Sequence, residues 1–224
     1  MSKLYVVPTP IGNLEDITLK ALRVLKEVDF ILAEDTRTTS VLLRHYNIGK
    51  SVVPYHQNNE HQVFERYCQR IVQGNQAALV TDAGTPAISD PGFLIVRECL
   101  KNGLSVECLP GATAFIPALV VSGLPSDRFV FEGFLPHKKG RKSRIEYIRD
   151  LPYSVILYES PHRLVKTLEQ LGEILGDDRH ISVSRELTKV FEETTRGTVS
   201  DVLTHYNGKT IKGEFVIVIE GKKQ

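Results

Sequence analysis

The sequence predicts an α/β protein of two domains, with a mostly parallel sheet in the first and a mixed sheet in the second. In the first half, short apolar segments rich in β-branched residues alternate with segments of helical periodicity. The loops that follow these strands are rich in Gly and Pro, which favours strand-to-helix connections. At residues 124–127 a cluster of turn residues precedes a strand-richer half. We therefore expect domains at residues 1–124 and 125–224.

The first domain is expected to alternate strands with helices, as in a parallel sheet covered on both faces. Its strands are expected at residues 4–7, 30–33, 52–55, 77–80 and 104–109. The strand at 52–55 is predicted to be peripheral, because Pro54 cannot donate to a strand ladder. Asp16 is predicted to cap the first helix, whose apolar positions run from Ile17 to Val28.

The second domain is expected to be α/β as well, with a larger share of its residues in strands. Its strands are expected at residues 129–134, 154–158, 180–185, 192–198 and 214–220. Helices are expected at residues 141–149, 161–175 and 200–206.

Composition excludes several classes of protein. A net charge of +1 predicts no general affinity for nucleic acid, so any such affinity must come from a local patch. Three cysteines without a CxxC pair predict buried free thiols in a reducing compartment. No leader pattern and no apolar run of the ~20 residues that a membrane helix needs are visible. We expect a soluble, cytoplasmic protein.

Four loops follow the strands of the first domain, at residues 8–13, 34–39, 81–92 and 110–113. Because the carboxyl ends of parallel strands meet at one edge of a sheet, these loops are expected to gather there. The longest loop, 81–92, is too long for a common connection and is predicted to approach a ligand, although a plain connection is the alternative. Neither GxGxxG nor GxxxxGK[ST] occurs, which argues against NAD and ATP. The Thr hydroxyls and carboxylates suit a neutral or cationic polar ligand with an amino-acid end.

A series of short motifs through both halves of the chain carries a resemblance to a known family. In order, they occupy residues 7–14, 33–37, 81–86, 89–92, 110–112, 134–136, 158–163 and 185–189. On these motifs the chain resembles the tetrapyrrole-methylase superfamily of S-adenosylmethionine-dependent methyltransferases. Within it, the chain is most similar to the family that methylates the 2′-oxygen of a cytidine ribose in 16S ribosomal RNA. The first loop lacks the Gly-rich segment of tetrapyrrole methylases, which favours the RNA branch, while methylation of a small tetrapyrrole is the alternative.

The resemblance implies that S-adenosylmethionine lies in a cleft between the two domains. By position, its contacts would be Pro10, Gly84, Thr85, Pro86, Ile88, Thr113, Ala114, Leu157, Glu214 and Phe215. Thr85 and Thr113 are expected to hydrogen-bond the methionyl carboxylate or the ribose. Thr113 is alternatively a helix N-cap after the Pro-Gly turn.

Methyl transfer to a ribose hydroxyl is helped by a base or a cation beside the oxygen. Asp35 or Glu159 is predicted to be that base, and Arg37 supplies a guanidinium beside Asp35. Asp35 is alternatively a helix N-cap. Glu159 is alternatively the partner of Arg163 in an ion pair four residues apart.

Residues 137–144 form the one dense basic segment, with five cations and no acid. Such a cluster is the expected footprint of RNA binding, although solvated charge is the alternative. Arg185 and Lys189, four residues apart, are mildly repulsive unless an anion such as a phosphate lies between them. The predicted RNA contacts are Lys138, Lys139, Arg141, Lys142, Arg144, Arg163, Arg185 and Lys189.

The expected partner is ribosomal RNA within the small ribosomal subunit. No association with a membrane is expected. The family resemblance also implies a homodimer. His56, Glu60 and His61 do not match a metal-ligand spacing and are predicted to form a loop or a polar wall of the substrate site rather than to bind metal. A non-catalytic module that binds nucleotide or RNA is a further alternative.

Overall fold

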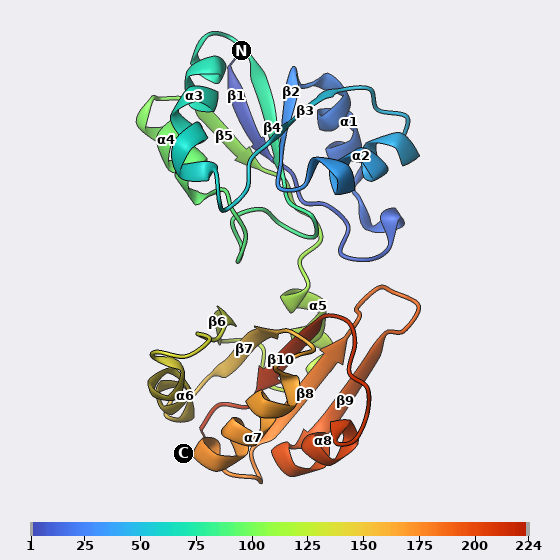
Figure 1. Cartoon of the computed structure of the whole chain (residues 1–224), viewed down its shortest axis with the longest axis vertical. Helices are drawn as coiled ribbons and strands as arrows, with labels where there is room; N and C mark the ends of the chain where they lie inside the picture. Colours follow the sequence, from blue (N-terminus) through green and yellow to red (C-terminus); the bar gives the residue numbers. More distant parts are fainter. Residues whose placement is uncertain (1, 223–224) are drawn as a thin grey trace. The chain divides into compact units, whose positions relative to one another are not determined.

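The computed structural model describes residues 2–222 and divides into two compact units between Thr113 and Ala114 (Figure 1). The sequence placed the domain boundary after residue 124. The difference is helix α5 (Phe115–Ser122), which packs over the sheet of the second unit. The sequence places α5 in the first domain because the cluster of turn residues that marks the boundary, at residues 124–127, follows this helix.

Unit 1 contains a five-stranded sheet in the order β3-β2-β4-β1-β5, and all of its neighbouring strands are parallel. The strands are β1 (Lys3–Val6), β2 (Phe30–Ala33), β3 (Ser51–Pro54), β4 (Gln76–Val80) and β5 (Ser105–Cys108). The predicted parallel sheet is confirmed. The strand that contains Pro54 lies at an edge, as its missing N–H requires.

Helices cover both faces of this sheet, because successive residues of its strands alternate between two hydrophobic cores. Phe30 and Leu32 belong to one core, whereas Ile31 and Ala33 belong to the other. The helices are α1 (Leu19–Glu27), α2 (Thr36–His45), α3 (Glu60–Val72) and α4 (Phe93–Lys101), with a short 3-10 helix η1 (Leu14–Asp16) before them.

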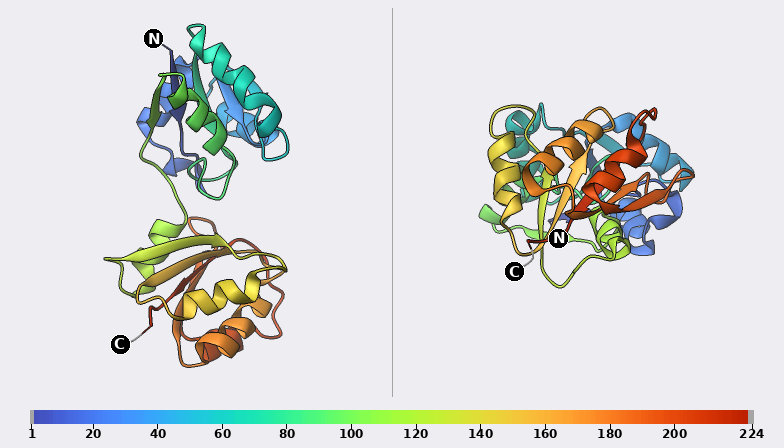
Figure 2. Two further views of the ribbon diagram at one scale, coloured as in Figure 1. Left: turned by 90° about the vertical axis from the view of Figure 1, so that its left-hand side faces the viewer. Right: turned by 90° about the horizontal axis from the view of Figure 1, so that it is seen from below.

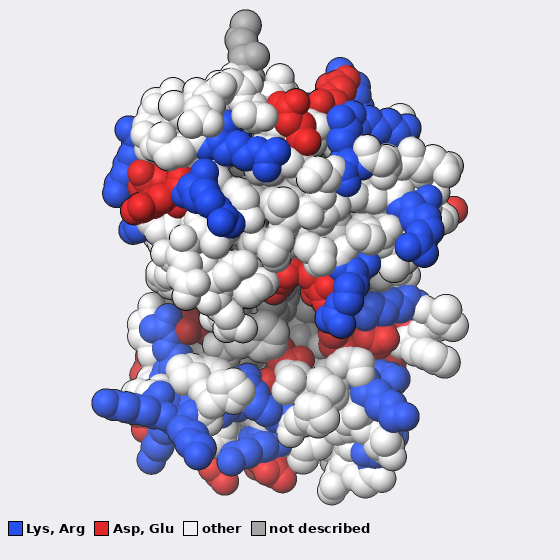
Figure 3. Space-filling view, turned by 45° about the horizontal axis from the view of Figure 1, so that its top comes forward, with Lys and Arg blue, Asp and Glu red and all other residues white. Residues whose placement is uncertain are grey.

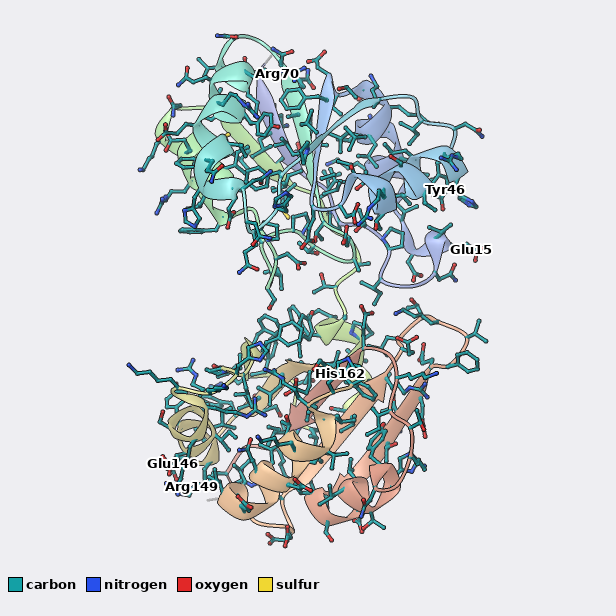
Figure 4. The ribbon with its side chains drawn as sticks, viewed as in Figure 1. Glu15, Tyr46, Arg70, Glu146, Arg149 and His162 are labelled. Atoms are coloured by element: carbon teal, nitrogen blue, oxygen red, sulfur yellow. The ribbon has the colours of Figure 1, made fainter. Side chains whose placement is uncertain are left out.

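The predicted cap of the first helix was wrong. Asp16 ends η1, and Thr18 caps α1 by accepting a hydrogen bond from the N–H of Ala21 at 3.0 Å. The end of α2 is tied to η1, because the hydroxyl of Tyr46 donates to the carbonyl of Leu14 at 2.6 Å. Tyr46 and Glu15, the neighbour of Leu14, are labelled in Figure 4.

Unit 2 contains the predicted mixed sheet, in the order β6-β7-β10-β8-β9. The strands are β6 (Phe129–Phe134), β7 (Ser154–Glu159), β8 (His180–Arg185), β9 (Glu193–Thr198) and β10 (Phe215–Ile219). The β6–β7 pair is parallel and the other pairs are antiparallel.

The two faces of this second sheet are covered differently. Helices α6 (Arg141–Arg149), α7 (Leu164–Leu175) and α8 (Val199–Tyr206) bury one face in a single hydrophobic core. Helix α5 lies on the other face, over β10 and β8, as Figure 2 (left) shows. The outer part of that face, along β6 and β7, carries aromatic residues.

All three cysteines are free, as predicted, and Cys68 and Cys99 are buried. The prediction of burial was wrong for Cys108, which is exposed at the end of edge strand β5. Among residues 2–222, no helix has the length and apolar character that crossing a membrane requires.

Candidate functional site

The loops that follow β1, β4 and β5 are joined at the carboxyl edge of the unit 1 sheet. The N–H of Thr9 donates to the carbonyl of Gly84 at 2.9 Å, and the N–H of Gly84 donates back to the carbonyl of Thr9 at 3.0 Å. The hydroxyl of Thr9, which is buried, donates to the carbonyl of Thr81 at 3.0 Å. The expected gathering of these loops at one edge of the sheet is therefore confirmed.

Two glycines allow this close approach. Gly84 is buried and has φ +87°, and a side chain there would begin 3.4 Å from Cγ2 of Ile11. A Cβ on Gly111 would lie 2.5 Å from Cβ of Pro8, so the turn before α5 contacts the first loop only because it carries no side chain.

Thr85 and Thr113 are brought together by these contacts. Their hydroxyl oxygens are 2.6 Å apart, and the hydroxyl of Thr85 is 3.0 Å from the carbonyl of Ala112. If the hydroxyl of Thr85 donates to the carbonyl of Ala112, the hydroxyl of Thr113 must donate to that of Thr85. Both hydroxyl protons are then used within the protein, and only oxygen lone pairs remain for a ligand. The pair is suited to accept from a ligand N–H or O–H rather than to bind a carboxylate as expected. Thr113 is not a helix cap, since α5 begins after Ala114 without a side-chain cap.

The backbone of the long loop adopts unusual conformations. Ala87 and Ser89 have φ of 68° and 65°, a region in which residues other than glycine are strained. Gly92 has φ +143°, and a Cβ there would lie 2.9 Å from Leu79. Such strain concentrates at binding and catalytic sites. The predicted contacts Pro86 (buried) and Ile88 (half-buried) lie in this same loop.

Carboxylates cluster beside the loop, at the ends of β2 and β4. The hydroxyl of Thr81 donates to Glu34, and the N–H of Asp35 donates to Oδ1 of Asp82 at 3.1 Å. Burial, and then the charge of Glu34, raise the pKa of Asp82. The same two causes raise the pKa of Asp90 to about 7.

The sequence analysis missed Asp82 and Asp90. Both occupy the motifs that carry the family resemblance, at residues 81–86 and 89–92, but nothing in their spacing indicates that they approach Glu34.

Asp35, one of the two predicted bases, caps helix α2. Its carboxylate accepts from the N–H of Arg37 at 2.8 Å and pairs with the guanidinium of Arg37 at 2.6 Å. These hydrogen bonds lower the pKa of Asp35 to about 2. A carboxylate held so far below neutrality is a weak proton acceptor. The structure confirms the alternative prediction, that Asp35 caps a helix, and the role of Asp35 as a base stays a prediction.

Glu159, the other predicted base, is enclosed in unit 2. Its side chain is 1% exposed and accepts from Nε of Arg163 at 2.7 Å and from the hydroxyl of Thr167 at 2.6 Å. A guanidinium nitrogen of Arg141 lies 3.6 Å from it. The carboxylate is fully engaged with cations and donors in the protein, so we correct its role from base to structural anchor.

Arg141 and Arg163 were predicted to hold RNA phosphates, and the structure contradicts this. The Arg141 side chain is 6% exposed and donates to Gln170 at 2.7 Å and to the carbonyl of Pro136 at 3.3 Å. Arg163 donates to the carbonyl of Leu135 at 3.2 Å. Both arginines thus fix the segment after β6 instead of facing a ligand. The neighbouring His162 is exposed in the loop before α7 (Figure 4).

The basic segment leaves three exposed lysines. Lys138 and Lys139 are exposed, and Lys142 is 80% exposed with only a 4.0 Å approach to Glu146. Arg144 is held by Glu132, with a second hydrogen bond of 2.8 Å. Figure 3 shows Lys and Arg side chains projecting from the lower left of this surface, where α6 lies in Figure 1.

Lys189 needs no phosphate to offset the charge of Arg185, contrary to the prediction. Lys189 pairs with Glu186 at 2.9 Å and with Glu214 at 2.8 Å, so the chain supplies its own anions. Arg185 ends β8 and donates to the carbonyl of Lys212 at 2.8 Å.

Leu157, Glu214 and Phe215 of unit 2 were predicted to contact the cofactor, and each has contacts within its own unit. The side chains of Leu157 and Phe215 are buried in the hydrophobic core, so their predicted contact with the cofactor stays a prediction that only their backbone groups could fulfil. Glu214 is exposed, and its carboxylate is the partner of Lys189.

Glu60, the acidic residue of the His56–His61 segment, has partners within the protein. It accepts from the hydroxyl of Tyr55 at 3.3 Å and from the N–H of Gly92 at 3.4 Å. Within residues 2–222, no group of three His, Cys, Asp or Glu side chains is arranged to hold a metal ion.

Comparison with known proteins places this site in a family. The family model described as Tetrapyrrole (Corrin/Porphyrin) Methylases matches residues 3–203. The chain is 48% identical over 219 residues to a protein of Halalkalibacterium halodurans named Ribosomal RNA small subunit methyltransferase I, covering 97% of this chain and 75% of that protein. It is 44% identical over 223 residues to the protein of that name from Thermotoga maritima, covering 100% of both.

Solved structures share the fold at lower identity. A diphthine synthase superposes with a TM-score of 0.75 at 16% identity, covering 99% of this chain and 91% of that chain. A uroporphyrin-III-C-methyltransferase from Thermus thermophilus superposes with a TM-score of 0.67 at 21% identity. The superposition covers 98% of this chain and 94% of that chain. At these identities the likeness concerns the fold alone.

Proposed function

The chain belongs to the tetrapyrrole methylase family, and we propose that it transfers a methyl group from S-adenosylmethionine to the 2′-oxygen of a cytidine ribose in small-subunit ribosomal RNA. The observation that carries this proposal is the 44–48% identity, over nearly the whole chain, with proteins named for methylation of that RNA. The ribose position and the cytidine rest on the motif resemblance of the sequence.

The joined loops of unit 1 fit S-adenosylmethionine chemically. The cofactor carries a sulfonium and an ammonium group, and Glu34 and Asp82 supply carboxylates at the sheet edge. Gly84 keeps the loop clear of a side chain, and the oxygens of Thr85 and Thr113 can accept from polar ligand groups. Pro10, Pro86, Ile88 and Ala114 add apolar surface for the adenine. When bound, the cofactor supplies an electrophilic methyl carbon.

We propose that Asp90 is the base that accepts the proton of the ribose hydroxyl. The hydroxyl loses its proton as the new O–C bond forms, and a base works best when its pKa lies near the working pH. Asp90, with a pKa of about 7, meets this condition, whereas Asp35, with a pKa of about 2, does not.

The RNA backbone is held by the exposed lysines 138, 139 and 142, which follow β6. These side chains can neutralise phosphates without first breaking a short ion pair. Binding should therefore weaken as salt rises, and the slope should become shallower when the lysines are changed to Gln.

We extend the proposal to a homodimer in the cytoplasm, where ribosomal subunits are assembled. Helix α5 is apolar on all sides, and Ile116 and Val120 are 46% and 71% exposed on its outer face. Helices of this kind are normally buried, which supports a second copy over α5. Light scattering should show a dimer for the native chain and a monomer for Val120→Lys.

A three-way substrate comparison tests the function. The protein is incubated with S-adenosylmethionine labelled in its methyl group and with small ribosomal subunits, uroporphyrinogen or neither. Label in the ribosomal RNA supports the proposal. Label in the uroporphyrinogen indicates a tetrapyrrole methylase, and cofactor binding without transfer to either indicates a binding module. Asp90→Asn, which should bind the cofactor without transferring label, is the matched control.

A further inference from the structure

Edge strand β6 ends in an exposed aromatic ring. Phe134 is 54% exposed, and its ring lies against that of Tyr158, with centroids 5.6 Å apart and planes at 63°. Tyr158 in turn contacts Phe131 at 5.1 Å, and Phe131 contacts Phe115 of α5 at 4.6 Å. These rings stand on the α5 face of the sheet, since the alternate residues, such as Leu157, point into the core on the other face.

The row of rings holds Phe134 in place. Edge-to-face contacts of this kind are favourable, and they limit the rotation of a side chain that would otherwise be free at the surface. A flat apolar ring, fixed by its neighbours and open to solvent, can accept a second flat ring at little entropic cost.

The segment after Phe134 is fixed as well. The carbonyls of Leu135 and Pro136 accept hydrogen bonds from Arg163 and Arg141, at 3.2 and 3.3 Å. Both arginines are anchored by the buried carboxylate of Glu159. The anchored pair therefore positions the chain between the exposed ring and the basic segment that follows it.

Two exposed lysines come next. Lys138 and Lys139 follow Phe134 by four and five residues, so their backbone lies within about 14–18 Å of it even if the chain is fully extended. A flat ring beside unpaired cations is the arrangement with which proteins bind single-stranded nucleic acid, by stacking on bases and neutralising phosphates. The charge of this segment favours RNA over an apolar protein surface as the occupant.

We propose that Phe134 stacks on an unpaired base of the RNA substrate, while Lys138 and Lys139 contact the flanking phosphates. This inference rests on the proposed function and adds the class of RNA. Bases inside a duplex are stacked on one another and present no free face, so the substrate region must be single-stranded or opened. Glu159, Arg141 and Arg163 are positioning residues for this surface.

Fluorescence offers a direct test, because the sequence contains no tryptophan. Phe134→Trp places one fluorophore in the stacking position. Tyr147→Trp is the matched control, since Tyr147 is 50% exposed and lies on α6, on the opposite face of the sheet. Unstructured oligocytidine RNA should quench the emission of Phe134→Trp but not that of Tyr147→Trp, and an RNA duplex of equal length should quench neither. Equal quenching of the two variants, or none, would overturn the proposal.

Activity gives a second readout with small ribosomal subunits as substrate. Phe134→Ala should lower kcat/KM by about 5–150-fold, mainly through KM, because one stacking contact is lost. Phe134→Tyr should restore it, since a phenol ring stacks as well. Unchanged kinetics of Phe134→Ala, or a loss explained by a shift from dimer to monomer in light scattering, would overturn the stacking role.

The two proposals fail separately. If the native protein methylates ribosomal RNA and Phe134→Ala does so equally well, only the stacking role is lost. If the native protein transfers no methyl group to ribosomal RNA, the proposed function is lost, and the fluorescence comparison alone decides whether Phe134 binds RNA bases.

Discussion

Replacing Asp90 by Asn removes a carboxylate charge while keeping nearly the same side-chain shape. In the folded protein, burial and the neighbouring Glu34 raise the pKa of Asp90 from 3.8 to about 7. Between these two pH values the folded state binds more protons than the unfolded state. The stability of the native protein relative to Asp90→Asn is therefore highest below about pH 4 and falls as the pH rises to about 7.

The size of this effect follows from the shift of the pKa. A shift of about 3 units at about 1.4 kcal/mol per unit gives an upper value of about 4 kcal/mol. Asp90 is only half-buried, so solvent screens part of this penalty, and we expect about 2 kcal/mol. At pH 8 the variant should therefore unfold about 4–8 °C above the native protein, and at pH 4 the two should unfold together.

Thermal unfolding followed by circular dichroism at pH 4 and pH 8 measures this difference. Asp127→Asn, at an exposed loop position, is the control for the loss of one carboxylate charge from the surface. The kcat of the same Asp90→Asn protein for methyl transfer should be about 10²–10⁴-fold lower than that of the native protein, since the amide cannot accept a proton. A melting difference that is equal at both pH values would refute the assigned environment, and full activity would refute the assigned role.

Three further predictions concern stability and reactivity. In the native protein Cys108, which is exposed, should react with a thiol reagent, whereas Cys68 and Cys99 should react only after unfolding, because their side chains are buried out of reach of the reagent. Three equal rates would contradict this. Glu159→Gln should lower the free energy of unfolding, measured in urea, by about 3–5 kcal/mol, since it leaves the guanidinium groups of Arg141 and Arg163 without a carboxylate. A loss below about 1 kcal/mol would show that these ion pairs are not buried in solution. Thr198→Ala should cost about 1 kcal/mol, because Thr198 and Asp201 form the capping box of α8, and Ser at position 198 should restore it.

The strands and most helices could be predicted from the sequence, because burial imposes a local pattern. The alternation of Phe30 and Leu32 with Ile31 and Ala33 was readable as an apolar strand, and the structure confirms it. The start of α1 was less certain, since Asp16 and Thr18 are both good caps two residues apart. Only the preceding 3-10 turn, which Asp16 completes, decides in favour of Thr18.

The candidate site was predictable in its location but not in its roles. Parallel strands bring their carboxyl ends together, so the meeting of Thr9 with Gly84 followed from topology. The roles of charged residues depend on contacts that sequence spacing does not reveal. Arg141 belongs to the most basic segment of the chain, yet the turn into α6 directs it into the core toward Glu159.

Two features on which the proposals rest were missed for the same reason. The pKa of Asp90 depends on burial and on Glu34, which lies far from it in the sequence. The aromatic row combines residues of β6, β7 and α5, which lie too far apart in the sequence to form one short motif.

Alkaline hydrolysis of the methylated RNA tests the central claim most directly. A methyl group on a ribose 2′-oxygen removes the nucleophile that cleaves the adjacent phosphodiester, so that one bond survives alkali. After incubation of small ribosomal subunits with the protein and methyl-labelled S-adenosylmethionine, the label should be recovered in a single alkali-resistant dinucleotide that begins with cytidine. Label recovered in ordinary mononucleotides would place the methyl group on a base and contradict the account.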